Sequence, residues 1–303
     1  MGAEAINLAL IAAAGAGVQV GAAIAVSRLA VGEVPPLTLA MLRYAIGAAC
    51  LLPFASRDLR ALLVTPPLHG RARDLAAMAL LGIVQFGILI ALLNFGLQRT
   101  GAAEAALIFS LFPLLTMLFA AAMGRERVTG TLVAGVLISI AGVAISLAPK
   151  LGSHAAGAWW GELAVLAAAV AGAVCSVLYR PYLQRYPTVP VSAIAMLASV
   201  AVLAVAALPE SWPSRVGGFT STAWLATAFI GLSSGIGYFA WLYALKHESP
   251  TRVTVFLALN PPTAAVVAWL LLREPIHPAV AAALLLVAGG LWLATRAPAP
   301  ASR

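Results

Sequence analysis

The stretch LNPPTAAVVAWLLLRE, residues 259–274, places two adjacent prolines inside an apolar run and ends that run with an arginine and a glutamate. Proline in a helix interior removes a backbone donor and clashes with the carbonyl four residues earlier. The segment LFPLLTMLFAAAMGRE, residues 111–126, has the same form, and Pro113 and Pro261 are 148 residues apart. The two Arg-Glu pairs are separated by the same interval, so the chain contains an internal repeat.

The composition predicts a membrane protein. Of 303 residues, 62% are hydrophobic and 9% are charged, whereas a soluble domain carries about 25% charged residues. The mean hydropathy is +1.00, which leaves too little polar surface for a water-soluble globule of this size.

The net charge of +8 does not predict nucleic-acid binding, because the basic residues are scattered through short loops. Cys50 and Cys175 both lie in apolar runs and are interpreted as buried small hydrophobes rather than a disulfide or a metal site. The first 27 residues lack a basic leader region and are interpreted as a retained first helix.

Apolar runs long enough to cross roughly 30 Å of hydrocarbon recur along the whole chain. They predict an all-α membrane protein with ten transmembrane helices. The predicted spans are residues 6–27, 36–54, 74–97, 102–122, 129–148, 159–179, 190–208, 222–244, 250–272 and 278–295.

Ten spans put both termini on one side of the membrane, and the basic residues indicate which side. With cytoplasmic termini, twelve basic residues fall on the inner side: Arg57, Arg60, Arg71, Arg73, Arg125, Arg127, Arg180, Arg185, Lys246, Arg252, Arg296 and Arg303. Five fall on the outer side: Arg28, Arg99, Lys150, Arg215 and Arg273. The positive-inside rule therefore favours cytoplasmic termini.

The repeat extends beyond the prolines. An interval of 148 also relates Gly87 to Gly235 and Gly142 to Gly290. The repeat divides the chain into residues 1–150 and 151–303, with five predicted spans in each half. Because five is odd, the second half must enter the membrane with the opposite orientation, which predicts two inverted repeats.

The spacing of proline, eleven residues and Arg-Glu at 113–126 and 261–274 resembles the EamA domain of the drug/metabolite transporter superfamily. The resemblance covers essentially the whole chain, twice; Pro262 is an addition to the family pattern. It implies ten helices around a central cavity and export of small metabolites across a bacterial inner membrane. YddG-type amino-acid exporters are members of this superfamily. The implied partners are a small-molecule substrate and membrane lipid, and the sequence indicates no oligomeric state.

Pro113 and Pro261 each lie about 16 Å into their spans, from opposite faces of the membrane, at 1.5 Å per residue. Kinked backbone at this depth is tolerated where it lines protein or a wet cavity. Pro113, Pro261 and Pro262 are therefore predicted helix kinks, and Asn260 beside them is a candidate substrate ligand. The prolines could instead serve packing alone.

Several polar side chains fall at membrane depth and are candidates for the substrate cavity. Gln85 and its repeat partner Ser233, followed by Ser234, could line a cavity or satisfy one another. Gln19 lies between Gly17 and Gly21, a spacing that also suits plain helix packing.

Arg43 is the one charged residue well inside a predicted span, where a charge is costly and functional by default. It could bind a substrate carboxylate or be anchored by Glu104. The EamA resemblance also implies an arginine here beside an aromatic residue, here Tyr44. Tyr238 lies near the midplane and is a candidate cavity residue.

No catalytic motif is present, so we predict neither an enzyme nor a cofactor or metal site. An amino-acid exporter that works by alternating access fits best, because neutral amides, hydroxyls, aromatic rings and one positive charge suit a zwitterion. The alternatives are a proton-coupled multidrug exporter, which needs a carboxylate at the midplane, and a lipid flippase. No Asp or Glu lies at the midplane, which favours facilitated or weakly coupled export.

Overall fold

The computed structural model describes residues 3–64, 71–124, 129–147, 159–274 and 278–295, and these residues contain helices but no strand. In chain order the helices of the first half are α1 (Ala3–Ala30), α2 (Pro36–Val64), α3 (Arg71–Gly82), the π-helix η1 (Ile83–Ile88), α4 (Leu89–Leu97), α5 (Ala102–Phe109), α6 (Phe112–Ala122) and α7 (Gly130–Leu147). The second half contains α8 (Trp160–Arg185), α9 (Thr188–Ala206), η3 (Leu208–Glu210), α10 (Trp212–Arg215), η4 (Val216–Gly218), α11 (Ser221–His247), α12 (Pro250–Thr254), η5 (Val255–Leu259), α13 (Asn260–Leu272) and α14 (Pro278–Thr295).

Within the described residues, eight helical segments are long and apolar enough to cross a membrane. Two shorter apolar helices, Val133–Ile145 and Pro278–Leu293, fall on the fifth and tenth predicted spans. Helices suit this environment because each satisfies its backbone hydrogen bonds within one segment. Large apolar side chains cover the outside of the bundle, such as Leu225, Ile236 and Leu285, which are 72%, 71% and 76% exposed. Such a surface fits lipid rather than water.

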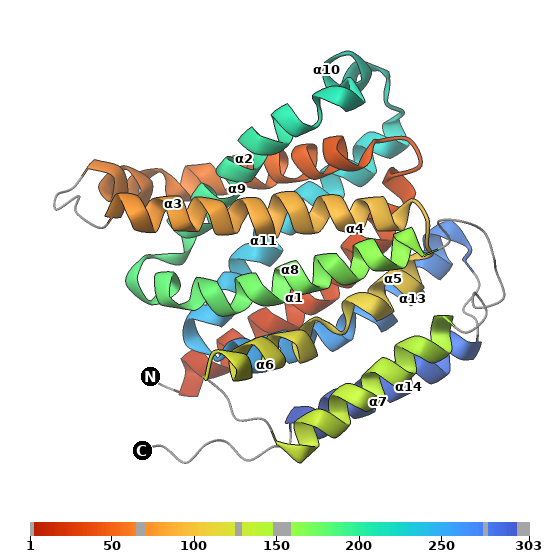
Figure 1. Ribbon diagram of the computed structural model, residues 1–303. Coiled ribbons are helices and arrows are strands. Elements are labelled where there is room, and N and C mark those ends of the chain that lie inside the picture. The colour runs from red at the N-terminus through yellow and green to blue at the C-terminus, as the bar shows by residue number, and fades with distance from the viewer. Residues whose placement is uncertain (1–2, 65–70, 125–128, 148–158, 275–277, 296–303) are drawn as a thin grey trace.

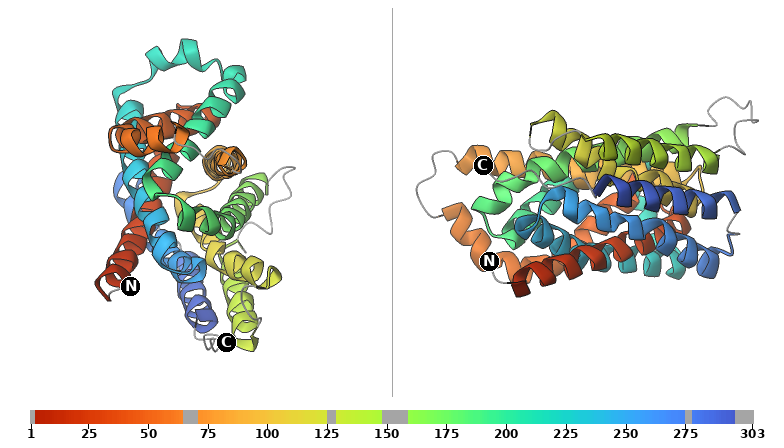
Figure 2. Two further views of the ribbon diagram at one scale, coloured as in Figure 1. Left: turned by 90° about the vertical axis from the view of Figure 1, so that its left-hand side faces the viewer. Right: turned by 90° about the horizontal axis from the view of Figure 1, so that it is seen from below.

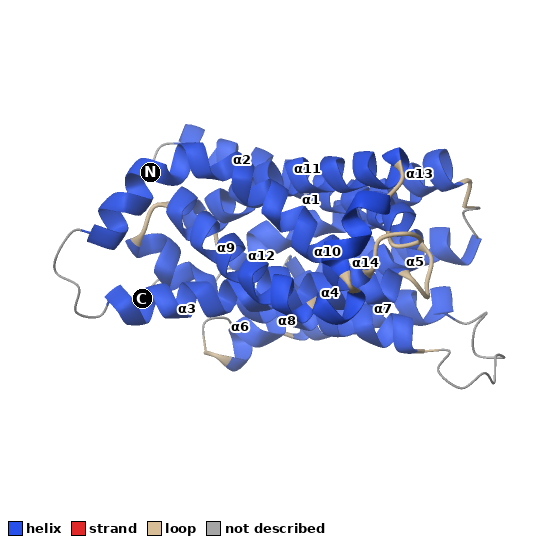
Figure 3. Ribbon diagram, turned by 90° about the horizontal axis from the view of Figure 1, so that it is seen from above, coloured by secondary structure: helices blue, strands red, loops and turns tan. Residues whose placement is uncertain are grey.

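The long helices lie side by side in one bundle (Figures 1 and 3). α7 and α14 form a pair at one edge, and the α10 region lies at the opposite edge (Figure 1). Figure 2 shows the same bundle end-on, with α1 and α11 packed together. Some helices extend past the predicted spans: α2 continues to Val64 and α8 to Arg185, with Pro181 inside it. The predicted spans end where the sequence becomes less hydrophobic, which indicates the edge of the hydrocarbon layer. A helix can continue beyond that edge into the aqueous phase.

The two predicted spans that contain Pro113 and Pro261 are interrupted near their centres. Residues 102–122 divide into α5 and α6, and residues 250–272 divide into α12, η5 and α13. Pro113 lies in the first turn of α6, and Pro261 lies in the first turn of α13. Proline is well tolerated at a helix start, because the missing N–H would have no intrahelical acceptor there. Each proline therefore lies where one helical segment ends and the next begins.

α7 and α14 run antiparallel, and repeat-equivalent positions meet at their contact. Gly142 faces Ala283 and Leu286, whereas its equivalent Gly290 faces Gly135 and Ser139. Position 135 is the equivalent of position 283. The contact of Gly142 with Ala283 and the contact of Gly290 with Gly135 therefore join equivalent pairs of positions. The Ser139 hydroxyl also donates a 3.4 Å hydrogen bond to the carbonyl of Val287, its own equivalent. This geometry is that of an approximate two-fold axis between the two helices.

Replacing Gly290 with alanine should lower the thermal stability of the purified protein, while the same change at Gly289 should not. A Cβ at Gly290 would lie 2.5 Å from the Gly135 carbonyl oxygen, whereas a Cβ at Gly289 meets nothing within 4 Å. Overpacking costs about 1–3 kcal/mol, and both variants gain the same helix propensity over glycine. Thermal unfolding in detergent measures the difference between the two variants. Equal melting temperatures would show that α7 and α14 can move apart to admit the extra methyl group at no cost in stability.

Three glutamates bind the starts of helices at one end of the bundle, and we name this end the glutamate face (Glu33, Glu210 and Glu274). The Glu210 carboxylate accepts hydrogen bonds from Leu37 N at 3.0 Å and Thr38 N at 2.7 Å, at the start of α2. A carboxylate is favourable there because it meets unpaired N–H groups and the positive end of the helix dipole.

The other two carboxylates of this face make similar contacts. Glu33 accepts from Thr220 N at 2.6 Å and from the Thr220 hydroxyl at 2.7 Å, and these bonds lower the pKa of Glu33. Glu274 accepts from Ala102 N at 3.3 Å and lies 3.5 Å from Arg28. Each of these contacts joins a residue of 1–150 to a residue of 151–303.

Candidate functional site

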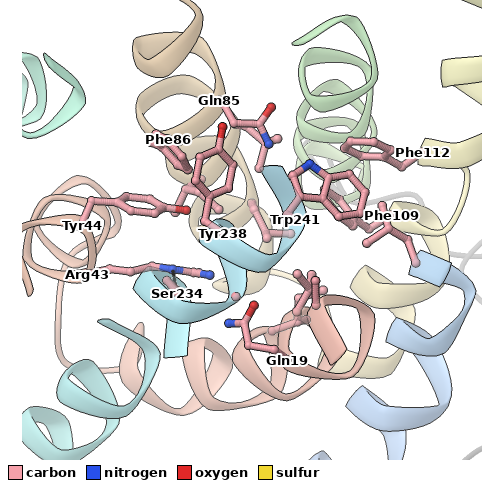
Figure 4. Close-up of a pocket in the computed structure, with 18 residues that line it drawn as sticks. Gln19, Arg43, Tyr44, Gln85, Phe86, Phe109, Phe112, Ser234, Tyr238 and Trp241 are labelled. Carbon is pink, nitrogen blue, oxygen red and sulfur yellow. Dashed lines mark hydrogen bonds between the residues drawn. The ribbon is translucent and has the colours of Figure 1, made fainter. Parts of the chain in front are cut away.

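A cavity lies among α1, α2, η1, α4, the α5–α6 break, α11 and η5 (Figure 4). Its polar lining consists of Gln19, Arg43, Tyr44, Gln85, Ser234, Tyr238 and Trp241. Its apolar lining consists of Ala16, Val20, Ile24, Phe86, Leu89, Ile90, Leu93, Phe109, Phe112, Gly237 and Leu257. Both helix breaks contribute, through Phe109 and Phe112 on one side and Leu257 on the other.

Arg43 extends from α2 into the cavity and is 5% exposed. Its Nε donates a 2.7 Å hydrogen bond to the Ser234 hydroxyl of α11, and Ser234 donates onward to the Ile230 carbonyl. α2 and α11 come close enough for this contact because Gly47 and Gly235 pack backbone against backbone. Small residues permit this approach between membrane helices.

No ion pair of Arg43 occurs in the described part of the chain. Anchoring by Glu104 is not observed, because Arg43 binds Ser234 and the Glu104 carboxylate accepts a 2.7 Å hydrogen bond from the Thr100 hydroxyl. None of the residues that line the cavity is acidic. The cavity therefore contains a cation whose remaining donors have no anionic partner, and a planar guanidinium is well suited to bind a carboxylate through two hydrogen bonds.

Gln19 is held at the edge of the cavity by α11. Its amide Nε2 donates to the Ser233 hydroxyl at 3.2 Å, and Gly237 packs against its side chain so closely that a Cβ there would collide with Oε1. Ser233 lies outside the cavity lining but positions a residue inside it. Gln85 and Ser233 do not satisfy one another as one reading of the sequence allowed, because Ser233 binds Gln19.

Gln85 reaches the cavity from the π-helix η1. π-helical turns are rare and are frequently found at functional sites. The Gln85 Oε1 atom is buried and has no hydrogen-bond partner. The Tyr238 hydroxyl interacts electrostatically with that of Tyr179, but neither hydroxyl makes a hydrogen bond of ordinary geometry.

Aromatic rings form much of the wall. The Phe86 ring lies 4.5 Å from that of Tyr44 and 4.2 Å, edge to face, from that of Tyr238. The Phe112 ring lies 6.1 Å, also edge to face, from that of Trp241. These are favourable aromatic geometries, and packing of this kind fixes the direction of each ring.

The repeat interval relates several of the residues that line the cavity. Five pairs of lining residues are 148 positions apart: Phe86 and Ser234, Leu89 and Gly237, Ile90 and Tyr238, Leu93 and Trp241, Phe109 and Leu257. Three of these positions are apolar in the first half and carry a polar group in the second. Repeat-equivalent positions therefore meet in one cavity but differ in chemistry between the two halves.

Six of the eight residues predicted for the cavity line it: Gln19, Arg43, Tyr44, Gln85, Ser234 and Tyr238. Ser233 binds one of them, whereas Asn260 does not line the cavity. The Asn260 side chain is 0% exposed at the start of α13, with neither amide atom paired. Its Cα packs against Gly21 of α1. Sequence reasoning predicted Tyr44 and Tyr238 of the aromatic wall but missed its other rings, those of Phe86, Phe109, Phe112 and Trp241.

Within the described residues, no three His, Cys, Asp or Glu side chains are placed to hold a metal ion. Cys50 and Cys175 are both free, and Cys175 is buried. The cavity lining offers one cation, neutral hydrogen-bonding groups and aromatic surface.

Comparison with known proteins relates the chain to membrane transporters. The model of the EamA-like transporter family matches residues 7–148 and again 159–296. A protein of Streptantibioticus cattleyicolor named probable terminal-alkyne amino-acid exporter is 36% identical over 229 residues, which cover 74% of this chain and 72% of that protein. The aromatic amino acid exporter YddG of Ancylobacter novellus is 30% identical over 207 residues, 66% of this chain and 69% of that one.

A crystal structure with 26% sequence identity matches with a TM-score of 0.69 and covers 96% of each chain. The family and the relatives named above are transporters rather than enzymes. Apolar helices long enough to cross the membrane occur in both halves of the chain. The chain therefore belongs to the EamA-like transporter family and is a multi-pass membrane transporter of small molecules.

Proposed function

We propose that the protein exports amino acids and that Arg43 binds the substrate carboxylate. The observation that carries this proposal is a buried arginine that faces the cavity without an anionic partner. A buried charge left unpaired is costly, and a substrate carboxylate would remove that cost while bound. The names of two relatives, both amino-acid exporters, support the same substrate class.

The two kinds of cavity wall suggest how an amino acid is oriented. The carboxylate would lie at Arg43 and Ser234, and the ammonium group beside neutral acceptors such as the Gln19 amide. The apolar side chain would then lie against the surface that includes Leu93 and Phe112. A cationic drug would instead meet the Arg43 charge in a cavity without an acidic lining residue, so the multidrug alternative is disfavoured.

We propose ten transmembrane helices arranged as two inverted repeats, residues 1–150 and 151–303. The antiparallel contact of α7 and α14, with Gly142 and Gly290 in equivalent environments, supports this arrangement. So do the two separate matches to the family model. The distribution of basic residues supports cytoplasmic termini in a bacterial inner membrane, which makes the glutamate face the outer face.

Alternating access by movement of one repeat against the other follows from this arrangement. In the present conformation the glutamate face joins the two halves through the contacts of Glu33, Glu210 and Glu274. These contacts must break for the cavity to open on that side. The lack of an acidic lining residue supports facilitated or weakly coupled export.

Competition among three related compounds tests the proposed substrate class. In proteoliposomes loaded for counterflow of labelled phenylalanine, unlabelled phenylalanine and the deaminated acid 3-phenylpropanoate should compete, because both carry the carboxylate. Phenethylamine, which keeps the ammonium group and the ring but lacks the carboxylate, should not. Competition by phenethylamine as strong as that by phenylalanine would contradict the role of Arg43 and favour a cation exporter.

A further inference from the structure

The Gln85 amide is an unexplained polar group in the cavity wall. Its Oε1 is buried without a hydrogen-bond partner among the described residues, and leaving a buried acceptor unsatisfied is costly. Ser233, its equivalent in the second half, is bonded to Gln19 and does not satisfy it. The side chain nevertheless lines the cavity, so a bound molecule could reach it.

The Tyr238 hydroxyl is a second polar group of the cavity wall, and it interacts with the Tyr179 hydroxyl. The residue is 8% exposed, its hydroxyl lacks a hydrogen bond of ordinary geometry, and its side chain lines the cavity. Edge-to-face contact with Phe86 holds the ring in place. Figure 4 shows the hydroxyl directed to the side of the cavity where Gln85 lies.

These two groups lie apart from the cation. In Figure 4 the Tyr238 ring separates Gln85 from Arg43, and Ser234 and Gln19 lie on the Arg43 side. The cavity therefore has a charged end at Arg43 and an uncharged polar end at Gln85 and Tyr238, with aromatic rings between them. An α-carboxylate and α-ammonium group are attached to one carbon, so both would be bound near the charged end. The uncharged end is left for a different part of the substrate.

We propose that Gln85 and Tyr238 form a subsite for a hydrogen-bonding group at the far end of the substrate side chain. This inference rests on the proposed function, because it takes the carboxylate to be bound at Arg43. The unpaired atom of Gln85 is an acceptor, so the subsite suits a donor such as a phenolic hydroxyl or an indole N–H. The substrates are then amino acids with an aromatic side chain that carries a donor. A site built for such a group discriminates against the analogue without it, because the protein groups are left unpaired.

The test compares tyrosine with phenylalanine, which differ by one hydroxyl, on three forms of the purified protein. Dissociation constants are measured by isothermal titration calorimetry for the unmodified protein, Gln85→Met and Gln98→Met. Methionine keeps the approximate shape of glutamine but removes its amide. Gln98 is a matched control, because it lies outside the cavity lining and its amide donates to the Val31 carbonyl at 3.4 Å.

Tyrosine should bind the unmodified protein and Gln98→Met about tenfold more tightly than phenylalanine, the effect of one hydrogen bond of roughly 1.4 kcal/mol. In Gln85→Met the ratio should fall to about one. Equal binding of both amino acids by the unmodified protein, or a ratio that survives in Gln85→Met, would overturn the subsite. If neither amino acid binds the unmodified protein, the proposed function itself fails.

A second comparison needs no variant and so does not depend on the folding of Gln85→Met. Tryptophan should bind the unmodified protein more tightly than 1-methyltryptophan, whose indole nitrogen cannot donate. Tighter or equal binding of the methylated compound would count against a subsite that accepts a hydrogen bond.

Discussion

Arg43→Gln should weaken amino-acid binding at least about 30-fold while leaving the thermal stability of the protein unchanged or higher. Removing one member of a buried charge pair costs about 2–5 kcal/mol of binding, and 2 kcal/mol corresponds to about 30-fold. Stability should not fall, because Arg43 makes no ion pair with any described residue, and a glutamine amide could replace its hydrogen bond to Ser234. The affinity of Arg43→Lys for amino acids should lie between those of the unmodified protein and Arg43→Gln, since an ammonium group keeps the charge but not the planar pair of donors.

Two measurements distinguish this role from a structural one. Binding of phenylalanine is followed by calorimetry, and the melting temperature is followed in the absence of substrate. Arg99→Gln provides a control, because Arg99 lies over the Phe95 ring at 3.7 Å and does not line the cavity. A clear drop in melting temperature for Arg43→Gln, with binding preserved, would make Arg43 a structural residue.

The sequence predicts the helices well, because crossing a membrane imposes a minimum apolar length that can be counted. Helix ends are less predictable, as α2 and α8 show by continuing to Val64 and Arg185. The breaks at Pro113 and Pro261 were predictable in position, since proline suits the first turn of a helix far better than its interior.

Within the cavity, polar residues could be predicted and apolar ones could not. Arg43, Gln19 and Gln85 are conspicuous in apolar spans, because placing them in hydrocarbon is costly. Phe86 and Trp241 resemble any other large apolar residue in a span, and only contacts between helices determine which of them face the cavity. The repeat interval reduces the number of candidate apolar residues, because Phe86 is the equivalent of Ser234, which is itself predicted to line the cavity.

Asn260 and Gln85 show the limit of estimating depth alone. Their predicted depths agree, but depth does not determine the direction in which a side chain points from its helix. η5 is a 3-10 segment immediately before Asn260, and η1 is a π-helix that contains Gln85. A 3-10 or π segment has a different number of residues per turn from an α-helix. The direction of a side chain in or next to such a segment therefore cannot be calculated from regular α-helical geometry.

Removing the carboxylates of Glu210 and Glu274 together should increase exposure of the cavity on the glutamate face about 30-fold. Both carboxylates cap helix starts, and both join one half of the chain to the other. A lost cap costs about 1 kcal/mol, so two lost caps shift the equilibrium between closed and open states by about 2 kcal/mol.

Glu33 adds a dependence on pH to the same face. The hydrogen bonds from Thr220 lower its pKa, so its contact stabilises the closed state at a pH above the ordinary range of glutamate. The contact weakens as the pH falls through the lowered pKa. Strong acidification of the outer side should therefore open this face further.

The measurement uses Ile90→Cys, at a cavity-lining position, in a protein without Cys50 and Cys175. A thiol reagent that cannot cross the membrane is added outside the cells, and the rate of labelling reports the open state. The double variant Glu210→Ala, Glu274→Ala should label about 30-fold faster than its parent.

Glu248→Ala is the matched control, because Glu248 pairs with Arg252 at 2.9 Å within one half of the chain, and movement between the halves does not break that pair. Its labelling rate should therefore equal that of the parent. If the double variant labels no faster than Glu248→Ala from outside the cells, but faster in inside-out vesicles, the glutamate face is cytoplasmic and the proposed orientation is reversed. If it labels no faster from either side, these carboxylates do not hold the two halves together.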